Sequence, residues 1–287
     1  MQISDDYARW AETNGPTASG CGDRFPSDAC IDEFIERFGT GAFRRPLEDD
    51  ERTSLRALFD GIAEEHGPEY GFRRLVQTIL LSPQVIYRAE IGAPFDGPIV
   101  GTPPEGGEIV VLDDYEIASL MSFALTNAPP DEALLEAAAA GRLRDADERA
   151  AQASRLMDQS HDVWRTFFWE WLHMSRFDPQ VEALAIDGAL AAAMREEYEE
   201  FIGRVVVDER GTLDDVFTSA SSWASPELAE FYGVSHSGSG LQPIDFDPSE
   251  RAGVLTQAAW LVSHGSRDDE YVVRRGMGVA QWCTRAA

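Results

Sequence analysis

Apolar residues recur every three or four positions along most of this chain, and this spacing lines one face of an α-helix. Over residues 113–127 the stripe consists of Ile117, Leu120, Met121, Ala124 and Leu125. No segment of comparable length alternates apolar and polar residues as a half-buried strand does. Residues 110–112 fit either a short strand or a hydrophobic staple in front of the helix. The sequence therefore predicts an all-α, multi-helical fold.

Capping signals give several helix boundaries. Asp113 and Glu116 have the spacing of a capping box, and Asn127 stands before Ala128-Pro129-Pro130, where a helix stops. A second helix is expected to follow up to Gly141, a natural left-handed cap, so that the two form a hairpin. Further helices are predicted at residues 28–38, 48–65, 70–87, 147–160, 162–174, 188–207, 226–232, 248–263 and 270–283.

Glycine and proline divide the chain. Residues 92–107 contain five glycines and four prolines without helical periodicity, which is typical of a linker. We therefore predict a flexible N-terminal segment (1–27), an N-terminal helical domain (28–91), a linker (92–109), a central helical domain (110–240) and a C-terminal helical segment (248–287).

The charge of the chain excludes several classes of function. There are 51 acidic and 24 basic residues, a net charge of -27, and every basic residue is arginine. Such a charge repels nucleic acid and anionic lipid. Without lysine there is no Schiff-base chemistry and no lysine of a phosphate-binding loop. Adaptation to salt and a GC-rich genome remain equal explanations for this composition.

The first ten residues are polar and lack the apolar core of a secretion signal, and no run approaches the roughly 18 apolar residues that span a bilayer. Direct membrane insertion is therefore not expected.

The chain has three cysteines, Cys21, Cys30 and Cys283. The first two lie nine positions apart, and two interpretations stay open: a small disulfide loop or two unpaired thiols. Neither C-x-x-C nor C-x-x-C-H occurs, so the chain lacks the ligands for a zinc ribbon or a covalently attached haem. We predict no cofactor and no metal site.

Two groups of residues on predicted helices favour structural roles over chemistry. Trp164, Phe167, Phe168 and Trp171 recur at helical spacing, as in a packed core, whereas Trp169 projects elsewhere and is a candidate binding residue. The glutamates at 196, 197, 199 and 200 are expected mainly on the solvated face, opposite an apolar stripe.

The remaining candidates are polar residues near helix ends. Gln257 and His264 are the candidate catalytic residues, and Arg267 in the following turn is a candidate binding residue. Arg44 and Arg45 precede a proline and are candidates to clamp carboxylates between helices or to bind an anionic group. The clamp is favoured because opposite charges are abundant in so acidic a chain.

Three sets of motifs resemble families of unknown function. Arg44-Arg45-Pro46-Leu47 and residues 79–83 with Tyr87-Arg88 are similar to domain of unknown function 1595. Residues 112–118, Pro129-Pro130-Asp131 and 225–233 resemble domain 1592. Residues 251–257, Arg275-Gly276 and Cys283 resemble the beginning of domain 1588, although Asp268-Asp269-Glu270-Tyr271 departs from that family's pattern.

The resemblance implies an exported, multidomain bacterial protein, and some members carry a planctomycete-type cytochrome c domain. It supplies no catalytic residue, and it implies that the chain is a fragment or a shortened member.

We therefore expect an unknown molecular activity, and a helical interaction or structural module that contacts other domains or proteins of the cell envelope. One alternative is an extracellular metal-dependent or hydrolytic enzyme. The other is an electron-transfer partner of a c-type cytochrome, with the haem supplied elsewhere.

Overall fold

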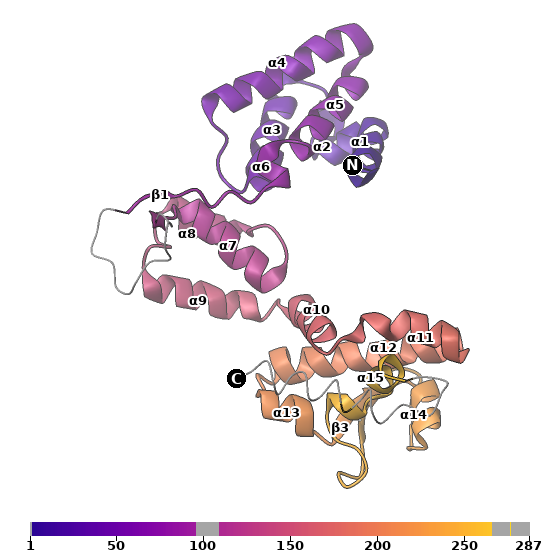
Figure 1. The fold of residues 1–287 in the computed structure, drawn as a ribbon. Coiled ribbons are helices and arrows are strands. Elements are labelled where there is room, and N and C mark those ends of the chain that lie inside the picture. Colours follow the sequence, from indigo (N-terminus) through magenta and orange to yellow (C-terminus); the bar gives the residue numbers. More distant parts are fainter. Residues whose placement is uncertain (1, 96–108, 266–275, 277–287) are drawn as a thin grey trace. The chain divides into compact units, whose positions relative to one another are not determined.

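The computed structural model describes residues 2–95, 109–265 and 276, and these are mostly α-helical (Figure 1), which confirms the all-α prediction. The chain divides into two compact units. The first contains residues 1–124 and 128–153, and the second contains 125–127 and 154–287. The predicted domain boundaries stay a prediction. Among the described residues, no helix is long and apolar enough to cross a membrane.

The first unit starts with short and long helices in succession. They are α1 (Gln2–Thr13), α2 (Gly15–Ser19), η1 (Gly22–Arg24), α3 (Asp28–Phe43), α4 (Asp49–His66), α5 (Pro68–Leu80), α6 (Pro83–Ile86), α7 (Asp114–Thr126), α8 (Glu132–Ala139) and α9 (Ala146–Met157), which runs into the second unit. Strands β1 (Ala93–Pro94) and β2 (Val110–Val111) pair antiparallel, with Ala93 opposite Val111.

The core of the first unit lies among α1, α3, α4 and α5, around fully buried Ile31, Phe72, Leu75 and Ile79. Residues 1–27, which were expected to be a flexible segment, instead contain α1 and α2. Ala8 and Ala11 of α1 are completely buried. The polar composition of this stretch gives no clear helical pattern in the sequence, because α1 packs through small apolar side chains.

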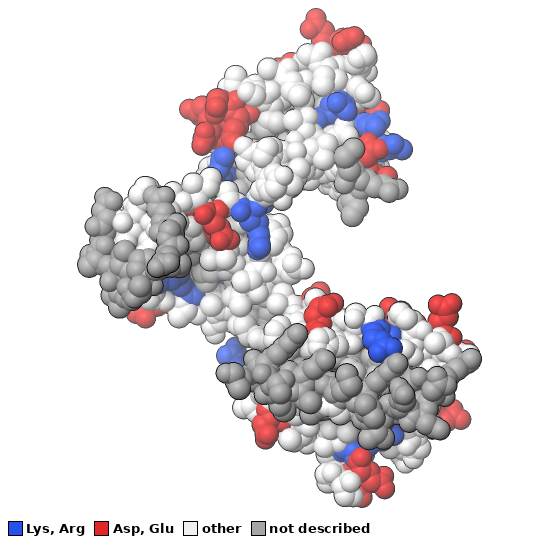
Figure 2. Space-filling model, in the orientation of Figure 1, with Lys and Arg blue, Asp and Glu red and all other residues white. Residues whose placement is uncertain are grey.

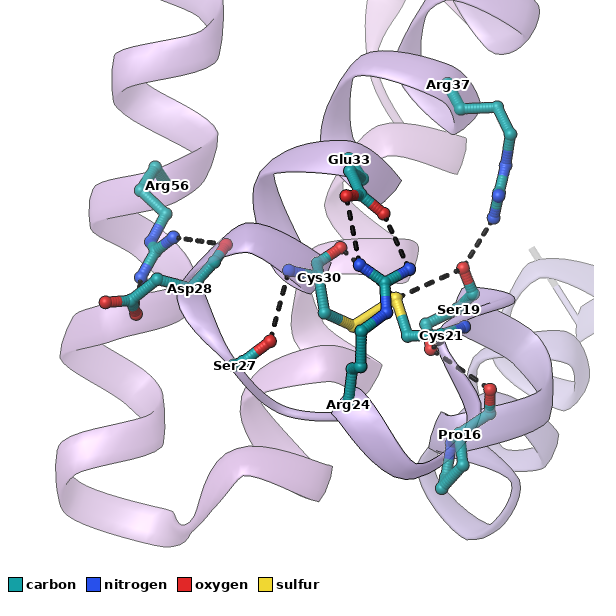
Figure 3. Close-up of a disulfide and its surroundings, with 10 residues drawn as sticks. All are labelled: Pro16, Ser19, Cys21, Arg24, Ser27, Asp28, Cys30, Glu33, Arg37 and Arg56. Atoms are coloured by element: carbon teal, nitrogen blue, oxygen red, sulfur yellow. Dashed lines mark hydrogen bonds and ion pairs between the residues drawn. A yellow bond between two sulfur atoms is a disulfide. The ribbon is translucent and has the colours of Figure 1, made fainter.

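A disulfide between Cys21 and Cys30 closes the loop that contains η1 (Figure 3). Beside it, Arg24 forms two hydrogen bonds to the Glu33 carboxylate, at 3.0 and 2.9 Å. Arg37 donates to the Ser19 carbonyl at 2.5 Å, which ties the end of α2 to α3. Of the two interpretations left open by the sequence, the structure has the disulfide.

The second unit contains α10 (His161–Trp171), η2 (Met174–Arg176), α11 (Phe177–Leu184), α12 (Gly188–Ile202), the π-helix η3 (Gly203–Asp208), α13 (Leu213–Thr218), α14 (Pro226–Tyr232), η4 (Val254–Thr256) and α15 (Ala258–Ser263). Strands β3 (Ser221–Ala224) and β4 (Gln242–Asp245) pair antiparallel, with Ser221 opposite Asp245.

Helix α12 provides much of the core of this unit through Tyr198, Phe201 and Ile202. The aromatic stripe on α10 is only partly core. Phe168 is buried, but Phe167 is 48% exposed. The core of the unit therefore covers only part of this aromatic stripe.

Three helix predictions differ from the structure for local reasons. The helix predicted at 70–87 is divided into α5 and α6, because Pro83 disfavours a helical conformation at Ser82. The helix predicted at 188–207 changes into the π-helix η3 after Ile202. That predicted at 248–263 begins only at η4, because Gly253 adopts φ 64° and lies against the Phe217 carbonyl. The helix predicted at 270–283 lies outside the described residues.

We predict that the disulfide stabilises the first unit by restricting its unfolded chain. For a loop of this size, replacing both cysteines by alanine should lower the free energy of unfolding by about 2–3 kcal/mol. Thermal unfolding with and without dithiothreitol tests this. The reductant should lower the melting temperature of the native chain and leave that of the double variant unchanged, whereas equal shifts in both would contradict a stabilising disulfide.

Candidate functional site

The first unit contains a cavity of about 340 Å³ between the end of α3, the segment after α6 and the start of α7. We call it the strap pocket. The residues that matter for its chemistry are Arg44, Arg45, Asp113, Tyr115, Glu116 and Ser119.

Arg44 ends α3 in a left-handed conformation with φ 61°, and its side chain is buried. Its Nη2 donates to the carbonyls of Gln84 and Tyr87, at 2.6 and 3.0 Å, and its Nη1 donates to the Ala42 carbonyl at 3.2 Å. Burial and the like charge of Arg88 lower the pKa of Arg44 below its ordinary value. Arg44 thus binds main-chain carbonyl groups and has no carboxylate partner among the described residues.

Arg45 has the partner that a carboxylate clamp requires. Its two terminal nitrogens donate to Glu51, at 2.8 and 2.9 Å, and Glu51 also caps α4 by accepting from the Glu48 amide. The hydrogen bond between them raises the pKa of Arg45 and lowers that of Glu51. The two adjacent arginines therefore have different roles, one toward a carboxylate and one toward carbonyls.

Glu116, in the first turn of α7, binds backbone amides of a distant segment. One carboxylate oxygen accepts from Ile91 and Gly92, at 2.8 and 3.0 Å, and the other accepts from Asp113 at 2.9 Å. Asp113 in turn accepts from the Glu116 amide, which completes the capping box that the sequence predicts. Burial acts to raise the pKa of Glu116, but the three amide donors outweigh it and lower the pKa.

Arg44 and Glu116 together hold residues 81–95, which we call the strap. Arg44 binds the strap at Gln84 and Tyr87, and Glu116 binds it at Ile91 and Gly92. Between Tyr87 and Ile91 the strap has neither helix nor strand. Val85 packs against the core of the unit, but the other large apolar residues of the strap are solvent-exposed: Leu81 39%, Ile86 58%, Tyr87 69%, Ile91 74% and Phe95 39%.

The second unit has a buried polar group around Glu197, which we call the Glu197 cluster: Glu197, Ser222, Tyr232 and Gln257. Glu197 is 0% exposed. Its carboxylate accepts from the Ser222 hydroxyl at 2.8 Å and from the Tyr232 hydroxyl at 2.6 Å. Gln257 donates to the Ser222 hydroxyl at 3.2 Å, and the Ala258 amide donates to the Tyr232 hydroxyl at 2.8 Å. The cluster therefore joins α12, β3, α14 and the start of α15.

The burial of Glu197 corrects the expectation that this group of glutamates faces solvent. Glu196 is exposed, as expected, but Glu197 points into the core. It lies three positions after Met194 and four before Phe201, so helical spacing places it on the apolar stripe. That spacing was the signal available in the sequence.

Burial raises the pKa of Glu197 to about 7, against the opposing effects of the two hydroxyl donors and of the positive charge of Arg251. Burial and the Glu197 charge also raise the pKa of Tyr232. The Arg251 guanidinium stacks over the Tyr232 ring, 4.7 Å from its centre. A carboxyl group with a pKa near 7 can change protonation close to neutral pH.

The other predicted site residues are dispersed. Gln257 is 3% exposed, and its Oε1 has no hydrogen-bond partner among the described residues. His264 stacks on Trp260, with ring centres 4.4 Å apart, and its Nδ1 lies 3.1 Å from the Trp260 carbonyl oxygen. Trp169 lies under the Arg195 guanidinium, at 4.4 Å. Arg267 lies outside the described residues.

Within the described ranges, no three potential ligand residues gather where they would hold a metal ion. The structure thus places Gln257 in the Glu197 cluster, and Arg44 and Arg45 in the strap pocket.

We predict that Glu197 makes the stability of the second unit depend on pH. Its folded pKa of about 7 lies above the ordinary value of 4.5, so folding favours the protonated form. This contribution is fully present below pH 4.5 and is lost as the pH rises through 7, with a magnitude of about 3 kcal/mol. Glu197→Gln should flatten the dependence of the unfolding free energy on pH between 5 and 8, as measured by urea denaturation.

The matched control is Glu196→Gln, on the exposed face of the same helix. It should keep the native slope. The same slope in all three proteins would show that Glu197 does not titrate in this range.

Comparison with family models gives two matches. Residues 30–90 match the model PSD5, protein of unknown function (DUF1595), and residues 112–234 match PSD4, protein of unknown function (DUF1592). Neither curated proteins nor solved structures gave a match. Arg44 lies in the first matched region and Glu116 in the second, so both regions contribute to the strap pocket. The chain thus combines, in this order, regions similar to two families whose activity is unknown.

Proposed function

We propose that the chain is a non-catalytic helical interaction module that binds another protein through the strap. The observation that carries the proposal is the exposure of Ile86, Tyr87 and Ile91, at 58, 69 and 74%, on a backbone held at both ends. Adjacent exposed apolar side chains are typical of surfaces that a partner covers.

The attachments of the strap favour tight binding. A segment that is already ordered loses little conformational entropy when a partner covers it. Arg44 and Glu116 supply that order, because they bind the backbone and leave the apolar side chains outside. Tyrosine is also among the residues that contribute most to binding energy at interfaces.

Charge indicates the kind of partner. The chain has a net charge of -27, and on the face shown in Figure 2 acidic side chains occur around both units. Such a surface attracts a basic partner and repels an acidic one. We therefore propose that the partner carries a basic surface with an apolar centre.

The proposed setting is an exported, multidomain bacterial protein of the cell envelope. The Cys21–Cys30 disulfide supports it, because disulfides persist in oxidising compartments. The resemblance to families that include cytochrome c domains makes a c-type cytochrome one candidate partner.

The Glu197 cluster favours a second candidate, an extracellular enzyme in which Glu197 exchanges a proton and Gln257 positions the hydroxyl of Ser222. Complete burial of Glu197 counts against it, because a substrate needs access to the carboxyl group.

We predict that Ile86→Ser with Tyr87→Ser abolishes partner binding and leaves the fold intact, because both residues are mostly solvent-exposed and neither lines the strap pocket. Chemical crosslinking in an envelope extract, followed by quantitative mass spectrometry, tests this. The control is Phe167→Ser with Phe231→Ser, which removes exposed aromatics from the second unit. A protein crosslinked to the native chain and to the control should be lost from the strap variant. Equal recovery with all three would refute the strap as the binding surface.

A further inference from the structure

Two hydroxyl groups in the strap pocket have no hydrogen-bond partner among the described residues. Ser119 is 8% exposed and lines the cavity, and its hydroxyl forms no hydrogen bond to any described residue. Tyr115 also lines the cavity, and its hydroxyl forms no hydrogen bond within the same described ranges. Hydroxyls that line a cavity without a protein partner are available to hydrogen-bond a ligand.

Arg44 adds hydrogen-bond donors that carry a positive charge. A guanidinium has five N–H groups, and the three hydrogen bonds of Arg44 to carbonyls leave the Nε–H and one Nη1–H without a partner in the described chain. Arg88 brings a second positive charge, and both guanidinium groups lie over the Phe123 ring, at 5.7 and 5.1 Å. No carboxylate pairs with either arginine among the described residues.

The other charged groups of the pocket are occupied. Arg45 is paired with Glu51, and both oxygens of Glu116 accept backbone amides. Within the described part of the chain, one carboxylate oxygen of Asp113 accepts no hydrogen bond, and together with Glu116 this residue repels a multiply charged anion. The pocket therefore suits a single negative charge at Arg44.

Apolar side chains complete the lining. Phe43, Ala89 and Ile91 face the same cavity, and about 340 Å³ is within the range of small-molecule sites. We propose that the strap pocket binds a small monocarboxylate with an apolar body, its carboxylate accepting hydrogen bonds from Arg44 and Ser119. Ile91 belongs both to this site and to the proposed protein contact, whereas Ile86 and Tyr87 do not line the pocket, so that substitutions of these two test the protein contact alone.

Isothermal titration of the whole chain with isovalerate tests the proposal, with isovaleramide as the uncharged analogue and inorganic phosphate as the multiply charged one. Isovalerate should bind with a dissociation constant of about a millimolar or tighter, and each of the other two at least about tenfold more weakly. Equal binding of the amide would overturn the proposal, as would tighter binding of phosphate or no saturation by isovalerate.

Ser119→Ala should weaken isovalerate binding roughly tenfold, because it removes one hydrogen bond to a charged group. The matched control is Ser54→Ala on the exposed face of α4, which should leave binding unchanged. Arg44 is unsuitable as the test because it also holds the strap. Unchanged affinity in Ser119→Ala would remove Ser119 from the site, and with it the proposed mode of binding.

Discussion

The binding of strap backbone by two charged side chains is the constraint on which the structure around the pocket depends. Between Tyr87 and Gly92 the chain has no helix or strand, so its carbonyls and amides need other partners. Arg44 supplies donors for the carbonyls of Gln84 and Tyr87, and Glu116 supplies an acceptor for the amides of Ile91 and Gly92. These hydrogen bonds satisfy the strap backbone, while Ile86 and Tyr87 stay mostly exposed.

In the second unit, the carboxyl group that binds several elements lies inside the core. Glu197 is completely buried, and its hydrogen bonds reach Ser222 and Tyr232 on two other elements. Both hydroxyls also accept a hydrogen bond, from Gln257 and from the Ala258 amide, so each donates its own proton toward Glu197. The cluster orients α12, β3, α14 and α15 relative to one another at the cost of burying a carboxyl group.

Local signals in the sequence predicted much of the fold. Helix α14 has the predicted limits, Pro226 and Tyr232, because Ser225 caps it and Gly233 ends it in a left-handed conformation. The capping box of Asp113 and Glu116 was also predicted, and hydrogen bonds in both directions confirm it. What the sequence did not reveal is the second function of Glu116, because its bonds to Ile91 and Gly92 span 25 and 24 positions. The different partners of Arg44 and Arg45 depend on tertiary structure in the same way. Strands β3 and β4 have only four residues each, too few for a clear alternation.

Hydrogen exchange at single amides tests the account most directly, because it measures whether the strap is held. The Ile91 and Gly92 amides should exchange slowly in the native chain, although the Ile91 side chain is 74% exposed. Glu116→Ala should make these amides exchange at rates close to those of an unstructured peptide, while amides within α5 keep their protection. Rapid exchange in the native chain, or unchanged protection in the variant, would show that Glu116 does not hold the strap.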